Sequence, residues 1–94
     1  MTQQYLVGEL SWRLSLLAAT GQGAARDEAG RLRRAAETCP LAGLGPVIER
    51  ALMLTDAMCW DSLRRGDVSS FARQTELCAD LYGFGVCADL IDER

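Results

Sequence analysis

Residues 46–65 read PVIERALMLTDAMCWDSLRR and carry the clearest helical pattern in the chain. Apolar and small side chains recur at intervals of three and four residues, which is the spacing of one helical face. Pro46 stands at the first position, where helices tolerate proline, and two arginines before Gly66 favour a helix C-terminus. The stretch therefore predicts a helix whose inward face consists of Val47, Ile48, Ala51, Leu52, Leu54, Thr55, Met58, Cys59 and Leu63.

The same spacing predicts two helices before this stretch, near residues 2–20 and 24–38, separated by Gly21 and Gly23. Residues 39–45 are expected to form the longest loop. The predicted inward faces are Leu6, Leu10, Leu14 and Leu17 in the first helix, and Ala25, Ala29, Leu32 and Ala36 in the second.

A fourth helix is predicted near residues 68–91, with Asp67 as its N-terminal cap. Gly83 and Gly85 weaken the pattern, but the apolar residues beyond them favour continued helix. The predicted inward face is Val68, Phe71, Thr75, Cys78 and Tyr82, continuing through Val86, Leu90 and Ile91. The sequence thus predicts an all-α, compact four-helix bundle-like fold in a single domain spanning residues 1–94.

Composition indicates a globular chain with room for one core. The 94 residues are 49% hydrophobic and 24% charged, with a net charge of -3. The apolar runs are far shorter than the roughly 20 residues needed to cross a bilayer. The N-terminal region has no basic segment followed by an apolar one, so we expect a cytoplasmic protein that does not bind membranes.

The chain contains no histidine, the side chain that most often acts as a general base near neutral pH and as a metal ligand. Its 13 carboxylates are scattered and form no pair at a defined spacing. We therefore expect no enzyme activity, no catalytic residue, no metal and no cofactor.

Two groups of large side chains lie off the predicted inward faces. In the first helix, Tyr5, Trp12 and Leu16 form a second apolar side, which either packs within the bundle or meets another chain. In the third helix, Met53 and Trp60 stand among charged residues, as interface residues do, unless the loop or the first helix covers them. These five residues are the predicted interaction site.

The cysteines offer an alternative function. Cys39, Cys59, Cys78 and Cys87 include no Cys-x-x-Cys pair, and cysteines on apolar helical faces usually pack as small hydrophobes. Cys87 lies off the main stripe and is the expected exposed thiol. A thiol- or metal-dependent function therefore stays an alternative, as does a ligand sensor with a pocket between the third and fourth helices around Met58, Phe71 and Tyr82.

Residues 62–70 resemble the turn of a helix-turn-helix, with Gly66 at the position of the usual glycine. However, Asp67 replaces the usual apolar residue. Residues 67–94 also hold six acids against two arginines, which suits phosphate poorly. Nucleic-acid binding is therefore the least favoured function.

Two segments, MCWDSLRRGDV at 58–68 and YGFGVC at 82–87, resemble small uncharacterised helical proteins of high-GC actinobacteria. This resemblance implies a helical cytoplasmic protein and transfers no activity to any residue. The sequence as a whole predicts an interaction module, an adaptor or a regulatory subunit. Its expected partner is another protein, including a second copy in a homodimer.

Overall fold

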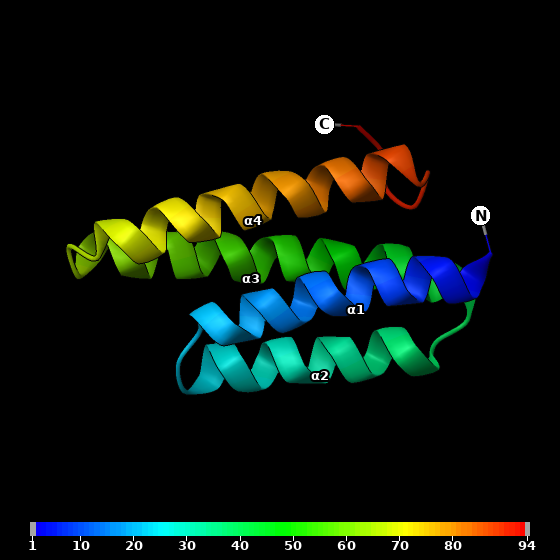
Figure 1. Cartoon of the computed structure of the whole chain (residues 1–94), viewed down its shortest axis with the longest axis horizontal. Coiled ribbons are helices and arrows are strands. Elements are labelled where there is room, and N and C mark those ends of the chain that lie inside the picture. The colour runs from blue at the N-terminus through cyan, green and yellow to red at the C-terminus, as the bar shows by residue number, and fades with distance from the viewer. Residues whose placement is uncertain (1, 94) are drawn as a thin grey trace.

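The computed structural model describes residues 2–93, which form four α-helices and one 3-10 turn. The elements are α1 (Gln3–Thr20), α2 (Ala24–Thr38), η1 (Leu41–Gly43), α3 (Leu44–Arg64) and α4 (Val68–Cys87). Figure 1 shows all four helices running lengthwise, with α1 beside α2 and α3 beside α4. The predicted all-α bundle is confirmed. Within the described residues, no helix is both long and apolar enough to span a membrane.

The core is built from the stripes predicted for α1 and α2. Leu6, Leu10, Leu14 and Leu17 are all buried, and they meet the small face of α2. Alanines on that face let the two helices approach closely, because their side chains end at Cβ. Buried residues from the other elements complete the core: Leu44, Val47, Ile48, Ala51, Leu52, Met58, Leu81 and Ile91.

The start of α3 differs from the prediction. The helix begins at Leu44 rather than at residue 46, and η1 occupies the middle of the expected loop over 39–45. Pro46 is therefore the third helical residue, which is allowed because the first turn has no intrahelical acceptors for its N–H groups. Leu44 and Gly45 are buried at this end, so tertiary packing extends the helix backwards.

The end of α4 also differs. The helix passes through Gly83 and Gly85 without interruption but stops at Cys87, so the prediction of helix to residue 91 was wrong. Asp89 takes a left-handed φ of 59°, and the amides of Leu90 and Ile91 then donate to the Gly85 carbonyl at 2.9 and 3.3 Å. We call residues 88–91 the C-terminal hook. Ile91 was correctly expected to pack, because the hook buries it against the bundle.

The most deeply buried residues of α4 lie off the predicted stripe, whose members Cys78, Tyr82 and Val86 are only partly buried. Leu81 and Gly85 point inward together with Gln74, which is 2% exposed. The Gln74 side-chain oxygen accepts from the Ser62 hydroxyl at 2.8 Å, and its nitrogen donates to the Thr20 carbonyl at 3.5 Å. Gln74 thus joins α4 to α3 and to the end of α1, because a buried amide must find hydrogen-bond partners.

The turn between α3 and α4 makes a hairpin, not a helix-turn-helix. Gly66 adopts a φ of 72°, which glycine accepts readily, and the chain reverses so that α3 and α4 lie side by side along their length (Figure 1). In the DNA-binding motif the two helices cross steeply. The resemblance of residues 62–70 to that motif therefore does not extend to three dimensions.

Asp67 caps α4 as predicted and should make stability depend on pH. Its side chain accepts from the Ser70 amide at 3.1 Å, and the Ser70 hydroxyl and amide hold the pKa of Asp67 below its ordinary value. A depressed folded-state pKa gives stability that is present above the unfolded-state pKa and is lost as the pH falls through the folded-state one. Asp67→Ala should therefore melt at a lower temperature than the wild type at pH 7.

The difference in melting temperature between Asp67→Ala and the wild type should shrink as the pH is lowered toward 2, measured by circular dichroism. Asp92→Ala is the control, because Asp92 follows the C-terminal hook and caps no helix. A difference that is the same at both pH values would contradict the capping role of the carboxylate.

Candidate protein-interaction surfaces

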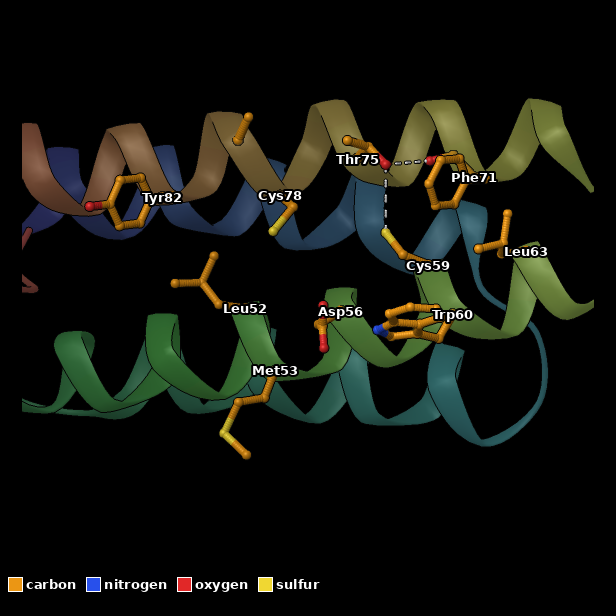
Figure 2. A pocket seen from close by; sticks show the side chains of 11 residues that line it. Leu52, Met53, Asp56, Cys59, Trp60, Leu63, Phe71, Thr75, Cys78 and Tyr82 are labelled. Atoms are coloured by element: carbon orange, nitrogen blue, oxygen red, sulfur yellow. Dashed lines mark hydrogen bonds between the residues drawn. The ribbon is translucent and has the colours of Figure 1, made fainter. Parts of the chain in front are cut away.

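A groove of about 780 Å³ opens between α3 and α4, and the lining residues that the structure describes all come from these two helices. Figure 2 shows side chains from both helices converging on it. Most of the lining is apolar or aromatic: Leu52, Cys59, Trp60, Leu63, Phe71, Cys78 and Tyr82. Asp56 is the only charged side chain among the lining residues that the structure describes. The groove is therefore a mainly apolar surface that carries the Asp56 carboxylate.

The α3 side of the groove carries the predicted residues Trp60 and Met53. Trp60 is 56% exposed and Met53 is 71% exposed, so neither the loop nor α1 covers them. Both lie beside the groove, with Trp60 along its edge and Met53 extending away from α4 (Figure 2). Leu63 is also exposed, although the sequence pattern placed it on the inward face. The outer side of α3 is thus more apolar than predicted.

The α4 side of the groove is the stripe that the sequence analysis assigned to the core. Phe71, Cys78 and Tyr82 lie partly buried beneath the groove, and Val68 is 71% exposed at the start of the helix. The expectation that this stripe packs inward holds in part: Cys78, Tyr82 and Val86 pack partly buried against the core, whereas Val68 and Thr75 are exposed. A second side of α4, with Leu81 and Gly85 buried, packs on the other helices more deeply.

The α1 surface is a second, separate cluster. Tyr5, Trp12 and Leu16 are each about half exposed, at 53%, 45% and 45%. The bundle therefore uses only the leucine face of α1, and the alternative in which both faces pack internally is wrong. The structure does not bring these residues together with Trp60 and Met53, because they lie on a different helix and line no part of the α3–α4 groove.

A charged cluster holds Trp12 in place. Its indole nitrogen donates to the Glu9 carboxylate at 2.5 Å, and the Arg13 guanidinium lies 4.4 Å from the Trp12 ring. Arg13 also lies 4.5 Å from the Phe84 ring and donates to Asp80 at 2.8 Å, which ties α1 to α4. Cation–π contacts and ion pairs of this kind fix the orientation of a ring.

Glu9 also perturbs its neighbours' ionisation. Hydrogen bonds from Trp12 and Tyr5 hold the pKa of Glu9 below its ordinary value. The hydrogen bond between Tyr5 and Glu9 also raises the pKa of Tyr5. Glu9 therefore carries its charge, and Tyr5 keeps its proton, throughout the neutral range. The α1 surface presents two aromatic rings beside a fixed carboxylate.

Protein-family models, curated proteins and solved structures were all compared with the chain, and none matched. The resemblance of residues 58–68 and 82–87 to actinobacterial helical proteins therefore stays a prediction.

The cysteines are thiols with different surroundings. Cys87 is exposed, as predicted, whereas Cys39, Cys59 and Cys78 are half-buried rather than fully packed in the core. The Cys59 sulfur lies 3.9 Å from the Thr75 hydroxyl, across the α3–α4 boundary. Among residues 2–93, no group of three or more Cys, Asp or Glu side chains is arranged to hold a metal ion.

Two of the three residues predicted to line a ligand-sensing pocket lie in the same groove, and the third does not. Phe71 and Tyr82 line the groove, and a volume of about 780 Å³ falls within the range of small-molecule sites. Met58 is buried and lies instead beside Gly21 and Gln74 on another side of α3. The pocket predicted around these three residues therefore does not exist in that form.

Proposed function

We propose that the chain is a protein–protein interaction module of the cytoplasm, an adaptor or regulatory subunit that associates with itself. The observation that carries this proposal is the exposure of all five predicted residues: Tyr5, Trp12, Leu16, Met53 and Trp60. A binding module acts through its surfaces and needs no catalytic residue, cofactor, nucleic acid or membrane.

The composition of the exposed surface supports a binding role. Large apolar side chains that stand singly on a surface are ordinary, but contiguous ones mark binding sites. Around the groove, Trp60 and Leu63 are exposed together, and Met53 lies one helical turn from Asp56. Aromatic residues and methionine are enriched in the centres of protein interfaces, where charge is sparse. The α3–α4 surface has this composition.

The magnitude of burial also favours association. Removing a side chain such as tryptophan, methionine or leucine from water is worth roughly 1.5–3 kcal/mol when burial is complete. Three such residues on α3 remain about half exposed or more in the single chain, so a partner that covers them gains about half of this free energy or more for each. Part of the gain is offset by the loss of translational and rotational freedom on binding.

Trp60→Ala is expected to weaken self-association by tenfold or more while leaving the fold intact, since about 1.4 kcal/mol corresponds to a factor of ten. The dissociation constant is measured by analytical ultracentrifugation, and folding by circular dichroism and thermal melting. Loss of helical structure in Trp60→Ala would show that the residue supports the core. An unchanged dissociation constant in a folded variant would exclude Trp60 from the interface.

A further inference from the structure

The groove lies within a wider surface made of two matched rows, one on each helix. On α3 the row is Met53, Asp56, Trp60 and Leu63, at intervals of three, four and three residues. On α4 it is Val68, Ala72, Thr75, Ala79, Tyr82 and Val86, at intervals of four, three, four, three and four. This alternation is the seam of a helix that packs against another helix along its length. We call the two rows the α3 seam and the α4 seam.

Both seams lie open to solvent in the single chain. Every residue of the α3 seam is exposed, and on the α4 seam Val68, Ala72, Thr75 and Ala79 are exposed. A helix that satisfies its packing within its own bundle has polar residues at such positions. Two neighbouring helices therefore present a single face, the α3–α4 face, that has the spacing for further helices but is covered by none of the helices that residues 2–93 form.

The two seams differ in size in a complementary way. The α3 seam is bulky at Met53, Trp60 and Leu63, whereas the middle of the α4 seam is small at Ala72, Thr75 and Ala79. Large side chains on one helix pack best against small ones on the facing helix. Each helix of this face would thus find a suitable partner in the other helix of a second copy.

The register of the hairpin sets which residues would meet. Cys59 contacts Thr75, and Ser62 donates a hydrogen bond to Gln74. Residues of α3 and α4 whose numbers sum to about 135 therefore lie at the same level along the helix axes. A two-fold axis parallel to the helices keeps each residue at its level along these axes. Trp60 of one copy would then face Thr75 of the other, and Asp56 would face Ala79.

We propose that two copies pair through the α3–α4 face about a two-fold axis parallel to the helices, so that α3 of each copy lies antiparallel on α4 of the other. The four helices form an antiparallel bundle in which Trp60 lies opposite Thr75, Leu63 opposite Ala72 and Met53 opposite Tyr82. This inference rests on the proposed self-association and names its surface and geometry.

Charge argues against the other symmetric arrangement. A two-fold axis perpendicular to the helices would set α3 on α3, with Asp56 near Asp56 and Trp60 near Met53 when the seams are centred on each other. Like charges close together destabilise such a contact, and two bulky seams would face each other while the two small seams left a gap. The parallel axis avoids both problems, because it separates the two carboxylates diagonally.

The available area is sufficient for a specific dimer. Two helices of about 20 residues rise roughly 30 Å and lie about 10 Å apart, so their common face covers on the order of 600 Å² per copy. A total near 1,200 Å² is at the lower end of specific interfaces. The resulting dimer should therefore dissociate measurably on dilution.

Ala79→Glu tests the surface. Ala79 is exposed, and alanine and glutamate are both good helix formers, so the variant should fold like the wild type. The dimer would bury the new charge opposite Asp56, which should raise the dissociation constant by about tenfold or more. Ala19→Glu is the matched control: an exposed alanine on α1 receives the same charge and should leave the dissociation constant unchanged.

Disulfide trapping tests the geometry, in a background where the four native cysteines are replaced by alanine and dimerisation is first verified. A mixture of Asp56→Cys and Ala79→Cys chains should yield the mixed disulfide on mild oxidation. Asp56→Cys alone should give little linked product. Predominant linkage of Asp56→Cys to itself would overturn the proposed axis.

The outcomes separate this inference from the proposed function. A dimeric wild type that Ala79→Glu dissociates and Ala19→Glu does not supports the α3–α4 face. If the wild type is dimeric, Ala79→Glu stays dimeric and Ala19→Glu dissociates, the inference is overturned and self-association stands, through α1. A wild type that stays monomeric at high micromolar concentration overturns both.

Discussion

Leu14→Ala should lower the free energy of unfolding by about 2–5 kcal/mol, the usual cost of truncating a fully buried leucine. Leu14 is 0% exposed and belongs to the leucine face of α1 that meets the core. The loss combines removed apolar burial with the cavity that rigid neighbours leave behind. Urea denaturation followed by circular dichroism measures it.

Leu16→Ala is the matched control for Leu14→Ala, because it makes the same chemical change two residues away on the same helix. Leu16 is 45% exposed, and alanine is a good helix former, so the free energy of unfolding of the single chain should fall by only about 1 kcal/mol. Equal effects of the two substitutions would contradict the assignment of one buried and one open face to α1.

Gly45→Ala should lower the free energy of unfolding by about 1.5–3 kcal/mol, roughly what burial of one large aliphatic side chain contributes. A Cβ at position 45 would collide with the backbone carbonyl of Leu90 in the C-terminal hook, and backbone cannot rotate away as a side chain can. The hook must then move, and Ile91 leaves its buried position against the bundle.

Gly8→Ala is the control for Gly45→Ala. A Cβ there meets no atom within 4 Å, so the variant should be more stable by about 0.5–1 kcal/mol through reduced backbone freedom in α1. Urea denaturation compares the two variants, and hydrogen exchange at the Leu90 and Ile91 amides reports on the hook. A Gly45→Ala variant as stable as the wild type, with those amides still protected, would contradict the close packing.

The leucine face of α1 and the apolar face of α2 were predictable from the sequence, because their residues recur at the spacing of one helical face. The sequence left open whether the second apolar side of α1 packs within the bundle, and the exposure of Tyr5, Trp12 and Leu16 answers this. The four helices themselves were equally plain, since glycines, Asp67 and the segment around Pro40 mark their boundaries.

The orientation of α4 was not predictable from its own residues. Its two apolar sides have similar character, and the side that packs includes a glutamine. Gln74 is buried because Ser62, 12 positions earlier, and the Thr20 carbonyl, 54 positions earlier, supply its hydrogen bonds. The path of the C-terminal hook was also not predictable. Leu90 and Ile91 continue a helical spacing in the sequence, but contacts with Gly45 and Gly85 determine where these two residues lie.

The candidate site was predictable in part. Trp60 and Met53 stood off the main stripe of α3, and Tyr5, Trp12 and Leu16 stood off that of α1, which made them the predicted interaction site. The groove was not predictable, because it exists only when α3 and α4 pair in a particular register. The role of Val68 and Leu63 as exposed residues depends on the same pairing.

The molar mass of the wild-type chain in solution tests self-association most directly. Light scattering is recorded over a concentration series into the high micromolar range, with tryptophan quenching by acrylamide on the same samples. We expect the mass to rise from 10.3 kDa toward twice that value as concentration increases, with quenching falling in parallel. A constant mass of 10.3 kDa, with both tryptophans quenchable throughout, would contradict self-association.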